Sequence, residues 1–244
     1  RATCALGLDN PHLWNGKQDP YLYKAVTVLK KDGKEVDRVE EMTGLRYFWV
    51  DADKGFFLNG KHLKLQGVCR HQDWAEIASA LTVENHLADY DLFDEIGANA
   101  LRLAHYPQAK FMFQEADRRG YIVWEEIPFV GGYVDIPDFD ENLRTQLREM
   151  IIQNYNHPSI CFWGLQNEVH AEIDRIIGDL NDIAHELDPG RLTTSASDQE
   201  HTYFHIPDSQ GWNKYFGWYY DTAPELGPFL DEFHANFPND RIAV

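Results

Sequence analysis

The pattern of hydrophobic and polar residues changes near residue 52 of this chain. In residues 21–29 apolar and polar side chains alternate, which is the period of a β-strand with one buried face. Residues 31–34 contain an Asp-Gly pair and predict a hairpin turn, and a further strand is predicted at residues 47–50. Because so few strands cannot close a sandwich, we expect residues 1–52 to be the C-terminal part of an antiparallel β-sandwich domain.

The rest of the chain repeats a different unit, in which a short apolar run ends in polar residues and a helical stretch follows. Seven runs are predicted to be strands, at residues 63–69, 100–104, 121–126, 160–166, 192–196, 215–218 and 242–244. Helices are predicted at residues 83–96, after an N-cap at Thr82, at 140–155 and at 171–187. Apolar strands separated by helices indicate a parallel sheet covered by helices.

Two arrangements are compatible with this repetition, a (β/α)8 barrel and a doubly wound sheet. No glycine-rich phosphate loop follows the first strand, and polar residues follow nearly every strand, where barrel enzymes carry their chemistry. We therefore predict an α/β fold, a (β/α)8 TIM barrel truncated near its seventh strand. Residues 53–244 are assigned to the N-terminal majority of this barrel, and residues 1–52 to the preceding domain.

The charge of the chain excludes several classes of partner. There are 22 Lys and Arg against 40 Asp and Glu, a net charge of −18, so non-specific binding to nucleic acid or to an anionic membrane is disfavoured. The apolar runs are far too short to span a membrane. A neutral or polyhydroxylated ligand fits this composition better, and the sequence leaves open whether the protein forms oligomers.

The cysteines and the first residues give little functional information. Cys4, Cys69 and Cys161 are too few and too scattered for a disulfide framework, and none lies in a C-x-x-C pair. We expect Cys69 and Cys161 to be small hydrophobic residues of strands. The chain starts at Arg1 without the features of a signal peptide, so we expect a piece of a longer polypeptide, whose cellular compartment stays unknown.

Polar side chains stand at the ends of six consecutive predicted strands. In a barrel these ends meet at one mouth, so the sequence predicts a binding or catalytic site there. The residues are Arg70, His71 and Asp73; Arg102 and His105; Glu125 and Glu126; Asn167 and Glu168; Ser195 and Ser197; and Tyr215, Trp218 and Tyr219.

Several of these residues have both a chemical and a structural interpretation. Glu168 follows an apolar, aromatic strand, and poor solvation there would favour the protonated carboxyl that a general acid needs, although Glu168 could instead cap the next helix. Asn167 could bind a sugar hydroxyl or close a turn. Arg102 is expected to pair with Glu125 or Glu126.

Other residues leave more alternatives open. His71 and His105 could bind hydroxyls, ligate a metal or be satisfied barrel histidines. The aromatic residues Trp218 and Tyr219 suit either a sugar face or a core. A cluster on one helix, Glu115, Asp117, Arg118 and Arg119, is predicted to face solvent, and His157-Pro158 is predicted to stabilise the bottom of the barrel.

Nine short motifs, in order along nearly the whole chain, resemble those of glycoside hydrolase family 2, the family of β-galactosidases, β-glucuronidases and β-mannosidases. They are Pro11-x-Leu13-Trp14, Asp19-Pro20-Tyr21-Leu22-Tyr23, Gly44-Leu45-Arg46, Phe57-Leu58-Asn59-Gly60-Lys61, Gly67-Val68-Cys69-Arg70-His71, Gly97-Ala98-Asn99-Ala100-Leu101-Arg102, His105-Tyr106-Pro107, Asn156-His157-Pro158-Ser159 and Trp163-x-x-x-Asn167-Glu168. The resemblance implies an immunoglobulin-like sandwich, of which residues 1–52 would be the end, followed by a catalytic TIM barrel.

The resemblance also implies roles for individual residues. Glu168 would be the general acid/base of a retaining glycosidase, and Asn167 would hold the sugar 2-hydroxyl. His71 and His105 would line the sugar site, Tyr215 would hydrogen-bond the nucleophile, and Trp218 would lie nearby as a further substrate-binding residue. The nucleophile of this family is a second glutamate that follows a stretch like residues 241–244, so we expect it beyond residue 244 and expect the segment alone to be inactive.

The resemblance leaves the sugar open. We predict a β-galactosidase because that activity is common in the family, with a β-glucuronidase or β-mannosidase as alternatives, and the negative net charge disfavours an anionic glucuronide. No metal or other cofactor is predicted, because residues 125–130 lack the downstream Glu-x-His of family members that bind one.

Two other function classes compete with a glycosidase. His71, Asp73, His105, Glu126 and Glu168 could form the site of a metal-dependent (β/α)8 hydrolase. The barrel could also bind carbohydrate without catalysis.

Overall fold

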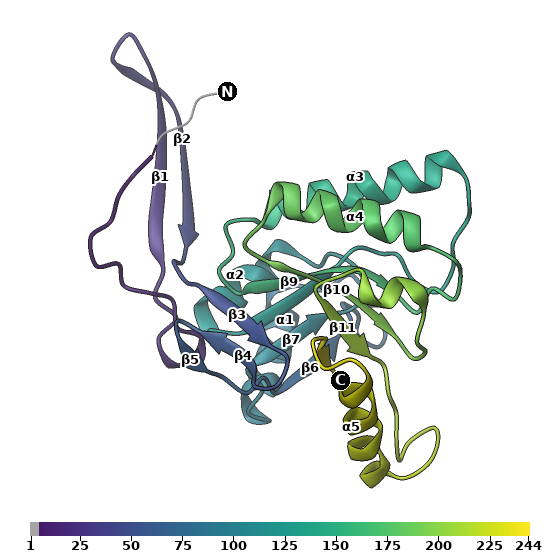
Figure 1. Ribbon diagram of the computed structural model, residues 1–244. Helices are drawn as coiled ribbons and strands as arrows, with labels where there is room; N and C mark the ends of the chain where they lie inside the picture. The colour runs from purple at the N-terminus through teal and green to yellow at the C-terminus, as the bar shows by residue number, and fades with distance from the viewer. Residues whose placement is uncertain (1–4) are drawn as a thin grey trace.

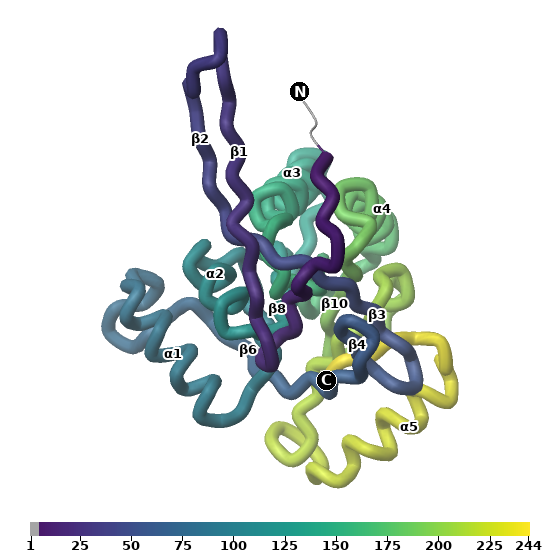
Figure 2. Tube along the Cα trace, turned by 90° about the vertical axis from the view of Figure 1, so that its left-hand side faces the viewer, coloured from purple at the N-terminus to yellow at the C-terminus, as the bar shows by residue number. Residues whose placement is uncertain are grey.

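Residues 5–244 are described by a computed structural model, which contains a two-stranded, a three-stranded and a seven-stranded sheet (Figure 1). Cys4 lies outside the described residues. Strands β1 (Tyr23–Lys31) and β2 (Lys34–Thr43) form the predicted antiparallel hairpin. Its turn residues, Asp32 and Gly33, both have positive φ, as a tight two-residue hairpin turn requires. In both views this hairpin projects away from the rest of the chain (Figure 2).

The three-stranded sheet joins the hairpin to the barrel. It consists of β3 (Phe48–Asp51), β4 (Gly55–Leu58) and β5 (Lys61–His62), all antiparallel. Phe56 and Leu58 pack with Trp14 against Ile122 and Cys161, which lie at the beginnings of two barrel strands. The sheet therefore covers the N-terminal end of the barrel strands and crosses the predicted boundary near residue 52, which stays a prediction.

The seven-stranded sheet confirms the barrel. All neighbouring strands are parallel and follow one another in chain order. A doubly wound sheet would reverse its strand order at a switch point, and this sheet does not. The strands are β6 (Gly67–Arg70), β7 (Ala100–Leu103), β8 (Ile122–Glu126), β9 (Ile160–Asn167), β10 (Leu192–Ser197), β11 (Ser209–Trp212) and β12 (Arg241–Ala243).

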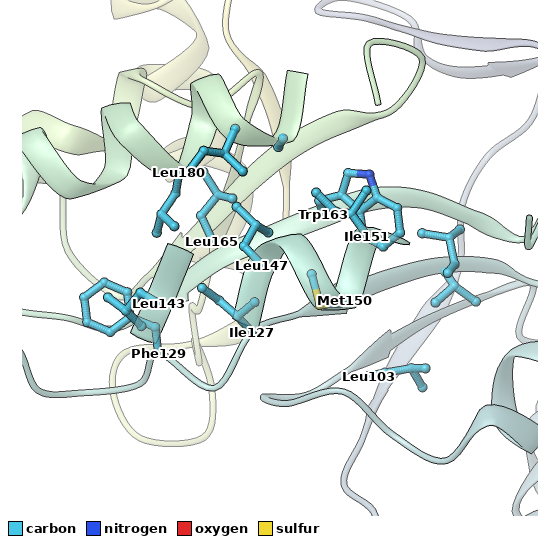
Figure 3. Packing of buried hydrophobic residues seen from close by; sticks show 14 of the residues in the cluster. Leu103, Ile127, Phe129, Leu143, Leu147, Met150, Ile151, Trp163, Leu165 and Leu180 are labelled. Atoms are coloured by element: carbon cyan, nitrogen blue, oxygen red, sulfur yellow. The ribbon is translucent and has the colours of Figure 1, made fainter. Parts of the chain in front are cut away.

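Helices connect the strands and cover the outside of the sheet. They are α1 (Val83–Glu95), α2 (Lys110–Arg119), α3 (Pro137–Asn154), α4 (Asp174–Leu187) and α5 (Leu226–Asn236), with short 3-10 helices at Gly16–Gln18, Thr202–His205 and Ala223–Glu225. Leu147 of α3 and Leu180 of α4 pack with Ile127 and Leu165 in the main core (Figure 3). None of the helices within residues 5–244 combines the length and the apolar composition that crossing a membrane requires.

The sixth strand is not where the sequence predicts it. The strand is Ser209–Trp212, and the predicted residues 215–218 lie in the loop that follows it. Ser209 and Gln210 look like loop residues, but they are buried because β11 is paired on both sides, with β10 and β12. The aromatic residues of the loop produced a strand-like signal without being part of the sheet.

Two further predictions about burial are wrong. Glu115 and Asp117 are buried, since Glu115 pairs with Arg118 and Arg119 while Asp117 pairs with the buried His157. Cys69 and Cys161 both lie in strands, as predicted, and Cys161 is buried, but Cys69 is exposed because its side chain faces the open interior of the barrel.

Candidate active site

A cavity of about 770 Å³ occupies the interior of the barrel, and all seven parallel strands contribute to its lining. Side chains alternate across a strand, so only every second residue of each strand can face this cavity. Eight polar residues line it at or just after the carboxyl ends of their strands: His71, Arg102, His105, Asn167, Glu168, Asn213, Lys214 and Tyr215. Five of them, His71, His105, Asn167, Glu168 and Tyr215, are sugar-site or catalytic residues predicted from the sequence.

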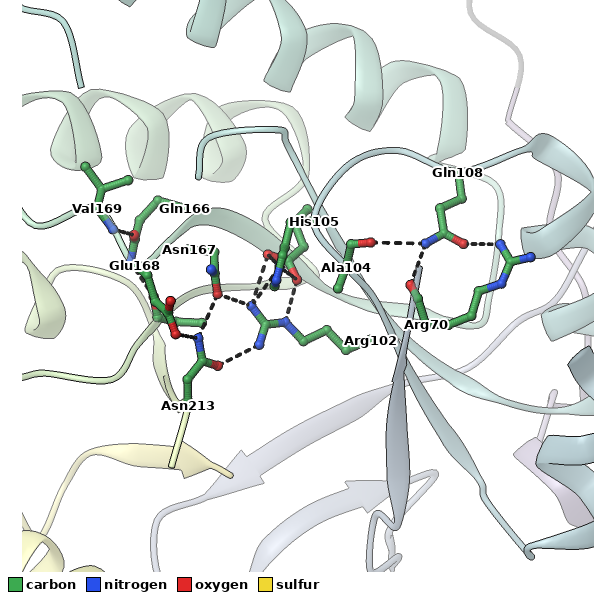
Figure 4. A network of polar contacts seen from close by, with 12 residues as sticks. Arg70, Arg102, Ala104, His105, Gln108, Gln166, Asn167, Glu168, Val169 and Asn213 are labelled. Atoms are coloured by element: carbon green, nitrogen blue, oxygen red, sulfur yellow. Dashed lines mark hydrogen bonds and ion pairs between the residues drawn. The ribbon is translucent and has the colours of Figure 1, made fainter. Parts of the chain in front are cut away.

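Arg102 lies at the centre of this group (Figure 4) and forms an ion pair with Glu126. Arg102 Nε lies 2.5 Å from Glu126 Oε1, and Arg102 Nη2 lies 3.2 Å from Glu126 Oε2. The guanidinium also stacks over the Trp124 ring, 4.3 Å from its centroid. Burial lowers the pKa of Arg102, but the charge and hydrogen bonds of Glu126 outweigh burial and raise it, so the guanidinium is a permanent cation. Of the two predicted partners of Arg102, Glu126 is the correct one.

Arg102 also orients the side-chain amides of Asn167 and Asn213, which line the cavity. Its Nη2 donates to Asn167 Oδ1 at 2.7 Å, and its Nη1 donates to Asn213 Oδ1 at 2.8 Å. Asn213 Nδ2 in turn donates to Asn167 Oδ1 at 2.8 Å and to Glu168 Oε1 at 2.7 Å. Glu168 is therefore connected through one amide to the buried ion pair (Figure 4).

Glu168 lines the cavity and does not cap a helix. The next helix, α4, has its N-cap at Ile173, so the capping interpretation is wrong. The backbone of Glu168 has φ of +50°, an uncommon conformation for a residue with a side chain. Its N–H donates to Ala196 O of the neighbouring strand at 2.9 Å. The backbone is thus fixed where the half-buried carboxyl reaches the cavity.

His71 and His105 lie side by side on the cavity wall. Their rings meet edge to face, with centroids 5.2 Å apart, and His105 Nδ1 lies 3.3 Å from Glu126 Oε2. Partial burial and the neighbouring His105 lower the pKa of His71. A neutral His71 ring has one donor and one acceptor, which suits hydrogen bonding to hydroxyl groups.

Tyr215 lies in the loop after β11 and lines the cavity. Burial, and then the carboxylate of Glu168, raise the pKa of Tyr215. Its phenol therefore stays protonated at neutral pH and can donate a hydrogen bond to a carboxylate or hydroxyl oxygen.

The structure does not bring all the predicted residues into the cavity. Trp218 is 74% exposed; it stacks on Tyr219 and touches Tyr215 edge-on, but it does not line the cavity. Arg70 faces α1, where it pairs with Asp89, and Glu125 is fully buried on the helix side of β8. Ser195 and Ser197 are also buried, and Asp73 is exposed outside the cavity lining.

The proposed metal site is not assembled. Across residues 5–244 no group of three His, Cys, Asp or Glu side chains is placed so that it could hold a metal ion. Glu126, which the metal-dependent alternative needs as a ligand, has both oxygens occupied by Arg102.

Asn213 is the site residue that the sequence analysis missed. It directly follows β11, as Glu168 directly follows β9, and its N–H donates to Ser197 O at 3.0 Å. Because the sixth strand was predicted too late in the chain, Asn213 was not recognised as a strand-end residue. Its position just after the short segment Ser209–Trp212 was the available signal.

Comparisons with known proteins identify relatives over nearly the whole chain. Residues 50–240 match the family model "Glycosyl hydrolases family 2, TIM barrel domain", and residues 2–46 match the model "Glycosyl hydrolases family 2". A β-glucuronidase from Bacteroides fragilis is 49% identical over 97% of this chain and 36% of its own length. A β-galactosidase from Thermoanaerobacter pseudethanolicus is 34% identical over 76% of this chain and 25% of its own length.

A solved structure is also similar to nearly the whole chain. Bacteroides uniformis β-glucuronidase 2, covalently bound to cyclophellitol-6-carboxylate aziridine, superposes with a TM-score of 0.90 at 36% identity, over 98% of this chain and 31% of that chain. The chain thus spans about a quarter to a third of the length of these relatives.

Proposed function

Because the chain belongs to glycosyl hydrolase family 2, we propose that the whole protein is a retaining β-glycosidase and that Glu168 is its general acid/base. The observation that carries this proposal is the strand-end Glu168 carboxyl, which lines the cavity beside Asn167 and accepts a hydrogen bond from Asn213. A carboxyl in this place can protonate the oxygen of the leaving group.

The retaining reaction needs a second carboxylate about 5–5.5 Å from the first, to attack the anomeric carbon. Glu126 does not suit this role, because its side chain is fully buried and both of its oxygens contact Arg102. The carboxyl end of β12 lies at the same mouth of the barrel as Glu168, and we place the nucleophile after this strand. In the first step Glu168 protonates the glycosidic oxygen while the nucleophile forms a glycosyl ester with the sugar. In the second step Glu168 takes a proton from the water molecule that hydrolyses this ester.

The other cavity residues have complementary roles in this proposal. Asn167, which accepts from Arg102 through Oδ1, keeps its amide N–H groups for the sugar 2-hydroxyl. His71 and His105 hydrogen-bond other sugar hydroxyls, and Tyr215 donates to the nucleophile. Trp218 lies farther out and would contact the substrate outside the described cavity.

We propose β-glucuronides as the substrates, with β-galactosides as the second candidate. The β-glucuronidase from Bacteroides fragilis is more similar to this chain than the β-galactosidase is, and the Bacteroides uniformis relative binds a carboxylated ligand. The net charge of −18 does not describe the mouth of the cavity, where the charged lining residues are Glu168, Lys214 and Arg102, and Arg102 is paired with Glu126. Three further lining cations, Lys54, Lys64 and Arg241, lie at the opposite end, where the barrel strands begin. The lining side chains at the mouth therefore carry no net negative charge, which is compatible with an anionic sugar.

The experiment compares the full-length protein with its Glu168→Gln variant on nitrophenyl β-glucuronide, β-galactoside and β-mannoside and on the corresponding α-glycosides. We expect hydrolysis of the β-glycosides only, fastest with the glucuronide, and a hydrolysis rate on the order of 10²–10⁴ times lower in the Glu168→Gln variant. Glu172→Gln is the matched control, because Glu172 is an exposed carboxylate four residues away, and it should retain the rate. A Glu168→Gln variant as active as the wild type would refute the assignment, and fastest hydrolysis of the galactoside would overturn the substrate.

A further inference from the structure

The hydrogen bonds of Arg102 determine how two neighbouring amides are oriented. A guanidinium has only donors, so the atom of Asn213 that it contacts at 2.8 Å must be the oxygen Oδ1. The same argument makes Oδ1 the atom of Asn167 that Arg102 contacts at 2.7 Å. The amide nitrogen of Asn213 must then point toward Asn167 and Glu168.

Both hydrogens of the Asn213 amide are used in this arrangement. One is donated to Asn167 Oδ1 at 2.8 Å and the other to Glu168 Oε1 at 2.7 Å. Glu126 fixes the Arg102 guanidinium, and the backbone N–H of Asn213 donates to Ser197 O. The side-chain amide of Asn213 therefore has no other orientation that satisfies the same donors and acceptors. The donor to Glu168 is therefore fixed by a buried ion pair.

We propose that Asn213 is a positioning residue that holds the Glu168 carboxyl in one plane and leaves its transferable proton on Oε2. This inference rests on the proposed function of Glu168. An oxygen that accepts an N–H at 2.7 Å is a poor place for a proton, because the hydroxyl oxygen of a carboxylic acid is a weaker acceptor than its carbonyl oxygen. The proton accordingly resides on Oε2, the oxygen that Asn213 leaves free.

The same hydrogen bond assists the transfer. When the glycosidic C–O bond breaks, the leaving oxygen takes the bonding electron pair and the proton from Oε2, and Glu168 becomes a carboxylate. The N–H of Asn213 then stabilises the negative charge that remains on the carboxyl group, since hydrogen bonds to a charged acceptor are stronger than neutral ones. Asn213 acts through Glu168 and forms no bond with the reacting atoms.

The test uses the full-length protein and two substrates with the same sugar, one with a dinitrophenyl and one with a phenyl leaving group. A dinitrophenolate leaves without protonation, whereas a phenolate needs the acid. Asn213→Asp keeps the shape and an oxygen for Arg102 but removes both donors, and Asn213→Ala removes the side chain. Gln153→Ala is a control, because Gln153 is an exposed amide of α3.

For both Asn213 variants we expect kcat/KM to fall about 10- to 100-fold for the phenyl glycoside and less than about 3-fold for the dinitrophenyl glycoside, as for an acid held in the wrong place. Equal losses with both substrates, or no loss in variants that unfold at the wild-type temperature, would overturn the inference. Full activity of Glu168→Gln would instead overturn the proposed function itself, so the two failures are distinguishable. If Asn213→Ala does not fold, the isosteric Asn213→Asp decides the question.

Discussion

The Arg102 guanidinium and the Glu126 carboxylate form a two-point ion pair inside the barrel, with Nε–Oε1 at 2.5 Å and Nη2–Oε2 at 3.2 Å. Both side chains are withdrawn from water, with 11% of the Arg102 side chain and none of the Glu126 side chain exposed. Because water does not solvate these charges, each one is stabilised by the opposite charge of the other. The pair also orients Asn167 and Asn213, so it connects the stability of the barrel to the geometry of the site.

Glu126→Gln should destabilise the protein strongly, because it leaves the Arg102 cation without a counter-ion in a buried place. We expect the free energy of unfolding to fall by about 3–5 kcal/mol. Urea-induced unfolding of the full-length protein, followed by tryptophan fluorescence, measures this change. Glu40→Gln is the control, since Glu40 pairs with Lys24 and Arg38 on the exposed hairpin. Equal unfolding midpoints for the two variants would show that the buried ion pair contributes no more to stability than the exposed one.

Gly120→Ala should also be destabilising, because Gly120 ends α2 with φ of +79° against the N-terminal segment. A Cβ at this position would lie 2.2 Å from the carbonyl carbon of Gly16, so the backbone would have to move. Gly131→Ala is the matched control: its φ is +70°, but no atom lies within 4 Å of the added Cβ. We expect about 1 kcal/mol of destabilisation at Gly131, from backbone conformation alone, and a clearly larger loss at Gly120.

Thermal unfolding of both glycine variants measures the difference. The steric argument is wrong if the two substitutions lower the melting temperature equally. Such a result would mean that the backbone of Gly16 moves away from the added methyl group without loss of stability.

The barrel could be predicted from the sequence because its central strands, such as β8 and β9, are buried along nearly their whole length and appear as apolar runs. The pair Asn167 and Glu168 could be placed for the same reason, since a polar pair directly after an apolar strand marks the strand end. The orientation of polar residues inside the strands could not be predicted. An apolar run does not reveal which alternate residues face the cavity, and so Glu125 and Glu126 were equally suitable partners for Arg102.

Other features depend on segments that are distant in the sequence. Asp117 was predicted to face solvent, yet its backbone oxygen accepts from Trp14 and its carboxylate contacts His157. Burial of this helix face is produced by residues about 100 and 40 positions away. The strand Ser209–Trp212 was missed because its burial comes from β10 and β12 on either side and not from its own composition.

Glu125 should make the stability of the protein depend on pH. Its side chain is fully buried; Asn154 Nδ2 donates to Oε1 at 2.9 Å, and Oε2 has no hydrogen-bond partner among the described residues. Burial raises the pKa of Glu125 well above its ordinary value of 4.5, and the nearby Arg191 and the bond from Asn154 offset this only in part. The folded protein therefore keeps the proton on Glu125 at pH values at which the unfolded chain has released it.

The sign of the effect follows from proton linkage. Above the unfolded pKa the folded state binds more protons than the unfolded state, so the free energy of unfolding falls as pH rises toward the raised folded pKa, by up to about 1.4 kcal/mol per pH unit. Glu125→Gln keeps the shape and removes the titration. We expect the melting temperature of the wild type to decrease more than that of Glu125→Gln between pH 6 and pH 9, roughly a range in which the unfolded carboxyl is ionised. Parallel curves for the two proteins would mean that Glu125 has the same protonation state in the folded and the unfolded chain.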